Sequence, residues 1–230
     1  MRQIRSYGDQ RHQAFCVHCG GRVETLDHAP SKVFLDEPYP ENLPKSPSCL
    51  KCNNGFSLDE QYLACLIECV VVGVVDPAKV ERSQIARVLR ETPKLAERLR
   101  RARREHEDRT VWQPENPRVE RVILKLARAH VAFECNEPRP DAPASLWFKP
   151  LIAMVDSERT TFEERPHGGA GVWPEVGSRT MARLAESLTE PSEGWLIVQD
   201  DRYRYRVSCD GYIRVQAVIR EYLAFEVNWD

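Results

Sequence analysis

The sequence predicts an α+β protein made of a small loop-rich unit, a helical middle and a C-terminal region of mainly antiparallel β structure. Two Cys-x-x-Cys pairs flank a proline-rich segment near the N-terminus, apolar residues recur at helical spacing in the middle, and short β-prone runs follow Pro138. We therefore divide the chain into residues 1–62, 63–135 and 136–230.

The composition is that of a globular protein that can bury a core without disulfides. Hydrophobic residues make up 42% of the 230 residues and charged residues 30%, which excludes collagen-like and wholly disordered chains. The longest apolar stretch, Leu63 to Val75, contains Glu68 and is too short to cross a bilayer. Met1 to Asp9 holds no apolar run, so we expect no membrane partner and a cytoplasmic location.

Eight cysteines in a chain without a visible export signal favour metal binding or free thiols over disulfides. Cys16 and Cys19 form one Cys-x-x-Cys pair, and Cys49 and Cys52 form the other. Four thiolates match the tetrahedral preference of zinc and leave no open coordination position, so the sequence predicts a structural zinc site. The remaining cysteines show no such spacing: Cys65, Cys69, Cys135 and Cys209.

The segment after the second cysteine pair is predicted to be helical. Ser57 to Glu60 matches a capping box, and apolar residues recur at helical spacing up to Gly73, so we expect a helix from about Leu58. Cys65 and Cys69 lie one turn apart on its apolar face, which favours packing in the core over a second metal site.

Three more helices complete the predicted middle of the chain. Cap-type residues before two prolines predict helices from Pro77 to Arg90 and from Pro93 to Glu107. A third helix has an apolar face from Val119 to Phe133. His130 lies on this face, where we expect a core histidine and not a metal ligand.

Short runs of strand-forming residues dominate the C-terminal region. They are Leu146–Phe148, Leu151–Val155, Trp195–Gln199, Tyr203–Ser208, Tyr212–Ile219 and Phe225–Trp229. Asp210-Gly211 predicts a two-residue hairpin turn, which would set Arg204 and Arg206 opposite the apolar positions from Ile213 to Ile219. A short helix is also expected from Arg179 to Leu188.

Polar residues typical of a hydrolytic site lie between and after the cysteine pairs. Asp27-His28 falls between the pairs, Asn42 follows within Glu-Asn-Leu, and Asn53-Asn54 comes directly after Cys52. The order Cys-x-x-Cys, Asp-His, Asn-Leu, Cys-x-x-Cys-Asn resembles the zinc-stapled HNH endonucleases, which have a ββα-metal nuclease fold. The resemblance covers about residues 12–62.

The resemblance implies a role for each of these side chains. His28 is expected to be the general base, because a neutral imidazole can take a proton from water near neutral pH. Asp27 and Asn53 are expected to hold a catalytic magnesium or manganese ion, which hard oxygen ligands favour, and Asn42 to orient the histidine loop. Three residues stay open as alternative ligands: Asn54, Asp59 and Glu60.

Charge is distributed unevenly along the chain. The net charge of −2 gives no overall nucleic-acid signature, but Lys and Arg outnumber Asp and Glu between Arg82 and Arg128. Six cations of this segment are candidates for contact with nucleic-acid phosphates: Arg98, Arg101, Arg104, Arg121, Lys125 and Arg128. The alternative is a solvated helical surface that pairs with nearby glutamates such as Glu97 and Glu120.

These expectations define two candidate functions. The first is a metal-dependent endonuclease that hydrolyses phosphodiester bonds, with DNA as the favoured substrate because most of the resembling family cuts DNA. The second is a non-catalytic zinc-ribbon protein that binds nucleic acid or acts as an adaptor, in which Asp27 and His28 only close a turn. The β region at residues 136–230 has no assigned role, and a homodimer contact and a protein partner are both open there.

Overall fold

The computed structural model of the protein has an α+β fold, as the sequence predicts. It describes residues 13–41, 43–107, 109–164, 178–179, 194–209 and 212–230. The chain forms two compact units, one made of residues 1–55 with 123–230 and the other of residues 56–122. The three-part division drawn from the sequence stays a prediction. No helix of the described residues is long and apolar enough to cross a membrane.

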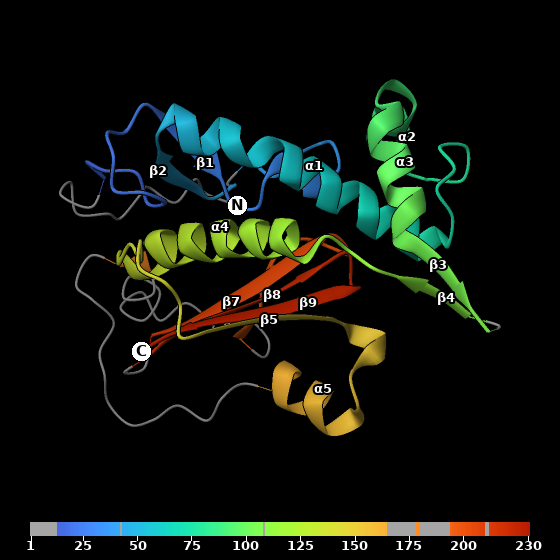
Figure 1. The fold of residues 1–230 in the computed structure, drawn as a ribbon. Coiled ribbons are helices and arrows are strands. Elements are labelled where there is room, and N and C mark those ends of the chain that lie inside the picture. The colour runs from blue at the N-terminus through green and yellow to red at the C-terminus, as the bar shows by residue number, and fades with distance from the viewer. Residues whose placement is uncertain (1–12, 42, 108, 165–177, 180–193, 210–211) are drawn as a thin grey trace. The chain divides into compact units, whose positions relative to one another are not determined.

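The first unit begins with a β-hairpin that leads directly into a helix. β1 (Thr25–His28) pairs antiparallel with β2 (Lys45–Ser48), and a 3-10 turn, η1 (Lys32–Phe34), lies between them. Helix α1 (Leu50–Val72) follows β2 and continues into the second unit. The order of these elements, two antiparallel strands and then a helix, is visible in Figure 1.

The start of α1 differs from the sequence prediction. The helix begins at Leu50 and not near Leu58. The reason lies in Cys49, whose sulfur accepts the backbone N–H of Cys52 at 3.3 Å and so occupies one of the unpaired donors of the first turn. The other end agrees with the prediction, because Gly73 follows the helix with a φ of 82°.

The second unit contains two short helices and a hairpin that the sequence did not predict. α2 spans Ser83–Glu91, α3 spans Pro93–Ala102, and the strands β3 (Arg103–His106) and β4 (Arg109–Trp112) pair antiparallel. The helix predicted to begin at Pro77 therefore begins later, at Ser83, and the helix predicted to end at Glu107 ends earlier, at Ala102. The Asp76 carboxylate accepts the N–H of Ala78 and its backbone carbonyl accepts the N–H of Lys79, which makes a turn, and Arg103 leaves the helix in an extended conformation. α4 (Asn116–Cys135) begins in this unit and ends in the first.

A five-stranded antiparallel sheet forms the C-terminal part of the first unit. Its strands, in the order β5-β9-β8-β7-β6, are β5 (Ser145–Pro150), β9 (Leu223–Trp229), β8 (Ile213–Ile219), β7 (Tyr203–Cys209) and β6 (Leu196–Gln199). The predicted strand Leu151–Val155 is wrong. Leu151 starts a 3-10 turn, η2 (Leu151–Ala153), because its side chain packs into a buried cluster with Phe162. Helix α5 (Asp156–Glu163) follows.

The pairing of β7 with β8 resolves the conflict in the predicted register. Tyr205 lies opposite Ala217, Arg204 opposite Val218 and Arg206 opposite Gln216, so the tyrosines and the arginines occupy different faces. Cys209 pairs with Ile213, one position away from the pairing that a two-residue turn would give. A shift of one residue exchanges the two faces of a strand. The Asp210-Gly211 turn itself, and the predicted helix after Arg179, lie outside the described residues.

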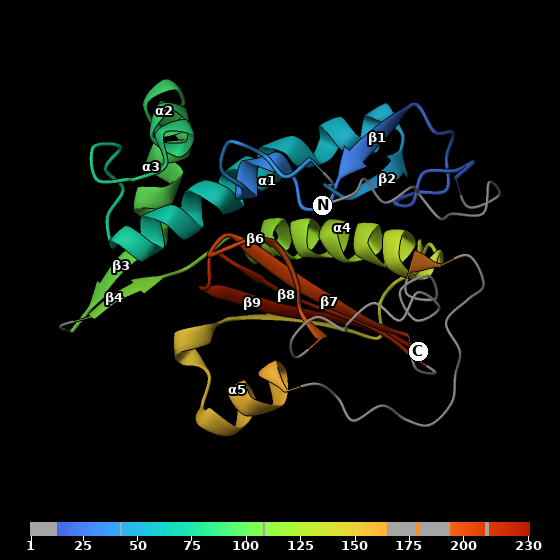
Figure 2. The same cartoon turned by 180° about the vertical axis from the view of Figure 1, so that it is seen from behind.

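Helices cover both faces of this sheet (Figures 1 and 2). On the face of α4, His130 is fully buried, bonds the Tyr203 hydroxyl at 2.8 Å and stacks on the ring of Tyr205. On the face of α5, Arg204 forms two hydrogen bonds to the carboxylate of Glu163. Burial lowers the pKa of His130 to about 3, so its ring is neutral and it belongs to the core, as predicted.

Of the described cysteines outside the two pairs, two are free thiols and two form a disulfide. Cys65 and Cys69 are buried thiols of α1, as predicted, and burial raises the pKa of each to about 12. Cys135 and Cys209 form a disulfide, which corrects the expectation of free thiols. The two residues end α4 and β7, and they are 74 positions apart, so no local spacing indicates the pair.

The buried ring of His130 predicts a pH dependence of stability. The ordinary pKa of a histidine is 6.5, whereas that of His130 in the folded protein is about 3. At pH values between these two, the unfolded chain binds a proton that the folded protein does not. This contribution is therefore complete above about pH 6.5 and is lost as the pH falls. We expect the free energy of unfolding to drop between pH 7 and pH 5 by about 2 kcal/mol more in the wild type than in His130→Gln. Urea denaturation at both pH values measures this, and equal drops would contradict it.

Candidate metal centre and the surroundings of His28

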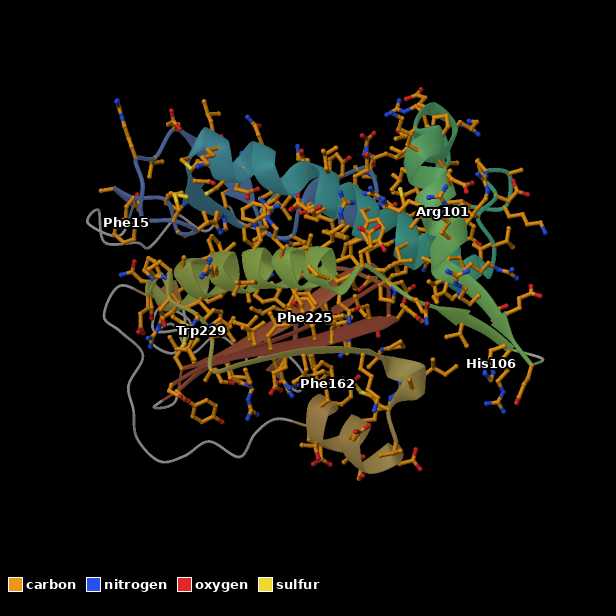
Figure 3. All side chains as sticks on the ribbon, viewed as in Figure 1. Phe15, Arg101, His106, Phe162, Phe225 and Trp229 are labelled. Carbon is orange, nitrogen blue, oxygen red and sulfur yellow. A yellow bond between two sulfur atoms is a disulfide. The ribbon has the colours of Figure 1, made fainter. Side chains whose placement is uncertain are left out.

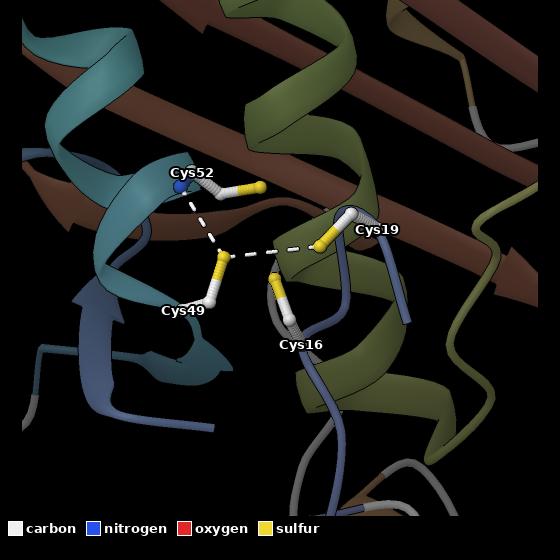
Figure 4. Close-up of side chains that lie close together, drawn as sticks. All are labelled: Cys16, Cys19, Cys49 and Cys52. Carbon is white, nitrogen blue, oxygen red and sulfur yellow. Dashed lines mark hydrogen bonds between the residues drawn. The ribbon is translucent and has the colours of Figure 1, made fainter. Parts of the chain in front are cut away.

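The four cysteines of the two Cys-x-x-Cys pairs lie together in the first unit. Their sulfur atoms are all within 4.8 Å of one another, and the Sγ atoms of Cys19 and Cys49 are 3.8 Å apart (Figure 4). Zinc–sulfur bonds of about 2.3 Å in a tetrahedron place the sulfurs about 3.8 Å apart. The cluster, made of Cys16, Cys19, Cys49 and Cys52, is therefore compatible with a metal ion such as zinc.

The first pair is held by a tight turn that depends on two glycines. The N–H of Gly20 donates to the carbonyl of Cys16 at 2.8 Å, and the N–H of Cys16 donates to the carbonyl of Gly21 at 2.7 Å. Gly20 has a φ of 71°, which side chains disfavour, and a Cβ on Gly21 would lie 3.3 Å from the sulfur of Cys19. These glycines let the backbone fold around the sulfurs.

The second pair uses the start of α1. Cys49 immediately precedes the helix and Cys52 lies in its first turn, where burial and the neighbouring sulfurs of Cys49 and Cys19 raise the pKa of the Cys52 thiol. Burial opposes ionisation of Cys16, but backbone N–H groups of Cys49, His18 and Cys19 outweigh it and lower the pKa of Cys16 to about 7. A thiolate at neutral pH is the form that binds a metal.

Asp27 and His28 are consecutive residues of β1, so their side chains project from opposite faces of the hairpin. Asp27 is paired with Ser46, and both are buried. His28 is paired with Lys45, which is exposed, and His28 itself is half-buried. The predicted catalytic pair is therefore split between an inner and an outer face.

On the inner face, Asp27 contacts a buried lysine. The Nζ atom of Lys125, from α4, lies 3.1 Å from each carboxylate oxygen of Asp27. The same ammonium donates to the Ser31 hydroxyl at 2.6 Å and to the His28 carbonyl at 3.3 Å. The Nε2 atom of His18 lies 3.7 Å from Asp27. Burial opposes ionisation of Asp27, but His18 and Lys125 together lower its pKa, so the carboxylate is charged.

On the outer face, His28 is surrounded by cations. Burial lowers the pKa of His28, and the charges of Lys32 and Lys45 lower it further, while Asp27 acts in the opposite direction. The net result is a pKa below 6.5, so the imidazole is neutral at pH 7. A neutral imidazole can accept a proton, and the neighbouring lysines favour an anionic ligand.

The predicted amide ligands are placed only in part. Asn53 lies in the first turn of α1, directly after Cys52, and is partly exposed, whereas Asn54 is exposed. Asn42 lies outside the described residues. In the second unit the alternative ligand Asp59 is buried and forms ion pairs with Arg118 and Arg121, both at 3.1 Å. The structure therefore gives Asp59 a structural role.

The six predicted phosphate contacts do not form one surface. Lys125 is buried against Asp27, and Arg128 donates to backbone carbonyls, including that of His18 at 3.2 Å. In the second unit, by contrast, α3 and the β3–β4 hairpin border a concavity of about 680 Å³. Three of the predicted arginines line it: Arg98, Arg101 and Arg104 (Figure 3 labels Arg101 and His106). Arg98 also pairs with Glu115, and Arg101 with Glu97.

The sequence analysis missed the pairing of Lys125 with Asp27. Lys125 was grouped there with Arg121 and Arg128 as a candidate phosphate contact, because the three residues recur at helical spacing in a segment rich in cations. A signal was available in the neighbours, since Val122 and Ala129 lie one turn to either side and are fully buried. His18 and Ser31, which also contact this ion pair, carried no separate signal.

Comparison of the chain with protein families, with curated proteins and with solved structures finds no match in any of the three.

The cysteine cluster predicts a one-to-one metal stoichiometry. We expect metal-free protein to bind one Co²⁺ ion per chain, with the thiolate charge-transfer absorption of a tetrahedral sulfur site. Cys16→Ser should weaken this binding by more than about tenfold, because even outer partners of metal ligands are worth that much. Cys65→Ser, a buried thiol of α1 outside the cluster, is the control and should still bind one ion. Binding that Cys16→Ser leaves unchanged would contradict the site.

The surroundings of His28 predict an abnormal titration. We expect its ring to titrate below pH 6.5 in NMR spectra, because burial and two lysines disfavour the imidazolium ion. Lys45→Gln should raise this pKa, since it removes one of the two cations. Lys149→Gln, which removes a lysine that pairs with Glu158, should not move it. A wild-type pKa at or above 6.5 would show that the lysines do not act on this ring.

Proposed function

We propose that the protein is an HNH-type endonuclease that hydrolyses phosphodiester bonds, with DNA as the favoured substrate. The observation that supports this best is the neutral, half-buried His28, which lies beside Lys45 at the end of β1. The hairpin that carries it is followed by a helix, and the cysteine cluster lies at the end of the hairpin opposite His28. This is the arrangement that the resemblance to the HNH endonucleases implies.

In this proposal His28 acts as the general base. Its imidazole would take a proton from a water molecule as the water oxygen attacks phosphorus, and the bond from phosphorus to the leaving 3′-oxygen would break as that oxygen takes a proton from a solvent water. Lys32 and Lys45 would attract the anionic backbone of the substrate and offset part of the charge on the phosphate. The products would be a 5′-phosphate and a 3′-hydroxyl, as the resemblance implies.

We propose a zinc ion as the occupant of the cysteine cluster. Four sulfur ligands favour zinc over harder cations, and a closed set of four leaves no position for a substrate. The ion would then be structural. It would join the turn before β1 to the first turn of α1, and so support the hairpin that carries His28.

The catalytic magnesium or manganese ion that the resemblance implies fits these residues poorly. Its expected ligands are Asp27 and Asn53, but both carboxylate oxygens of Asp27 already lie 3.1 Å from the ammonium of Lys125. A divalent cation at these oxygens would be repelled by the ammonium at short range. In the proposed reaction such an ion therefore takes no part.

The basic concavity of the second unit is a separate proposed contact for nucleic acid. Arg98, Arg101 and Arg104 come from α3 and β3, and clustered cations of this kind bind phosphates by releasing counterions. Lys125 and Arg128 are not part of this proposal, because one is buried and the other bonds backbone carbonyls.

A non-catalytic nucleic-acid-binding protein with the same zinc site is the second candidate. The ion pair of Asp27 with Lys125 favours it, because Asp27 then stabilises the fold and has no part in chemistry. The exposed lysines and the basic concavity would serve binding alone in this case.

A nicking assay separates the two candidates. With supercoiled plasmid, in the presence and in the absence of magnesium, we expect the wild type to nick DNA and His28→Ala to lose about 10²- to 10⁴-fold of the rate, the usual contribution of a general base. Lys149→Gln, on the α5 side of the sheet, is the control and should nick at the wild-type rate. Each variant is first checked for wild-type circular dichroism and zinc content.

The other outcomes are equally informative. Equal nicking by the wild type and His28→Ala would remove His28 from the mechanism. Binding of DNA by both proteins without any nicking would establish the second candidate.

A further inference from the structure

We propose that the ammonium of Lys125 is the resident cation of the His28 segment, and that it occupies the place at Asp27 where an HNH site holds a divalent ion. The proposal concerns the same site as the proposed nuclease, but only its consequence for catalysis rests on that function. The placement of the cation can be tested without any cleavage.

The first argument is the set of atoms around the ammonium. The Nζ atom of Lys125 has four oxygen neighbours: Oδ1 and Oδ2 of Asp27 at 3.1 Å, the carbonyl oxygen of His28 at 3.3 Å and Oγ of Ser31 at 2.6 Å. A carboxylate, a carbonyl and a hydroxyl are the oxygen donors that hard metal cations take in proteins. Here an ammonium takes them, and its three protons need acceptors of this kind.

The second argument is burial. The side chain of Lys125 is 0% exposed and that of Asp27 is 8% exposed, so little water can replace either partner. A buried charge is tolerated only when it is paired, and each member of this pair offsets the charge of the other. Exchange of the ammonium for a metal ion would leave a second buried charge without a partner.

The third argument is where the ammonium sits on the chain. It bonds the carbonyl of His28 on one side of Ala29-Pro30 and the hydroxyl of Ser31 on the other. One cation from α4 therefore holds both ends of the turn that follows β1. In a metalloenzyme the ion would hold a substrate phosphate as well, but the buried ammonium cannot reach one.

Metal titration of the zinc-loaded protein tests this placement. Mn²⁺ binding is followed by electron paramagnetic resonance. We expect the wild type and Asp27→Asn to bind Mn²⁺ equally, because Asp27 holds no metal ion in the wild type. Lys125→Ala takes away the ammonium and leaves the oxygens, so it should bind one Mn²⁺ at least tenfold more tightly than the wild type. Lys125→Met fills the same space without a charge and should not gain the site.

Two outcomes would overturn the proposal. One is a wild-type Mn²⁺ site that Asp27→Asn abolishes, because Asp27 would then be free for a metal. The other is a folded Lys125→Ala protein that gains no Mn²⁺ site. A Mn²⁺ site that persists in the double variant with Asp27→Asn would count in the same way, because Asp27 would then not be its ligand. The wild-type titration decides the question even where Lys125→Ala does not fold. A protein that fails to nick DNA leaves all these results valid, so the two proposals can fail separately.

Discussion

The buried charge of Lys125 is the constraint that orders the surroundings of His28. An unpaired ammonium in this position would cost several kcal/mol, so the segments around it have to supply acceptors. Asp27 therefore turns inward to face α4. Because successive residues of a strand face opposite ways, the same constraint turns His28 outward, beside Lys45. The accessible imidazole is thus a consequence of an ion pair on the other side of the hairpin.

The cysteine cluster acts on the same hairpin at its other end. A hairpin of two four-residue strands is not stable by itself in water. Cys19 precedes β1 and Cys49 follows β2, so a bound metal would join the two ends of the hairpin, while Lys125 holds the turn after His28. With a metal bound, the hairpin would be fixed at both ends by interactions between polar or charged groups. Such interactions would explain how a segment interrupted by several prolines can hold His28 in place.

The sequence predicted those features whose causes are local. The sulfur cluster follows from two short turns, and the end of α1 follows from Gly73. Features that depend on distant partners were missed or wrong. Lys125 has the spacing of a surface stripe, and only its contact with a strand 98 residues away makes it a core residue. The segment from Arg103 to Trp112 has helix-forming residues, but pairing across the hairpin overrides this preference. The disulfide and the register of β7 were hidden for the same reason.

The burial of each lysine near His28 decides whether that lysine can contact a ligand. The ammonium of Lys125 is buried and paired with Asp27, whereas Lys32 and Lys45 are exposed and can contact a phosphate. A metal ion bound to a phosphate oxygen stabilises a transition state by several kcal/mol, but exposed ammonium groups are hydrated and screened by salt, so they contribute much less. The outer face is therefore better suited to holding an anionic backbone than to rapid hydrolysis. Both candidate functions propose that this face binds an anionic backbone, and they differ in whether the neutral ring of His28 removes a proton from water once that backbone is bound.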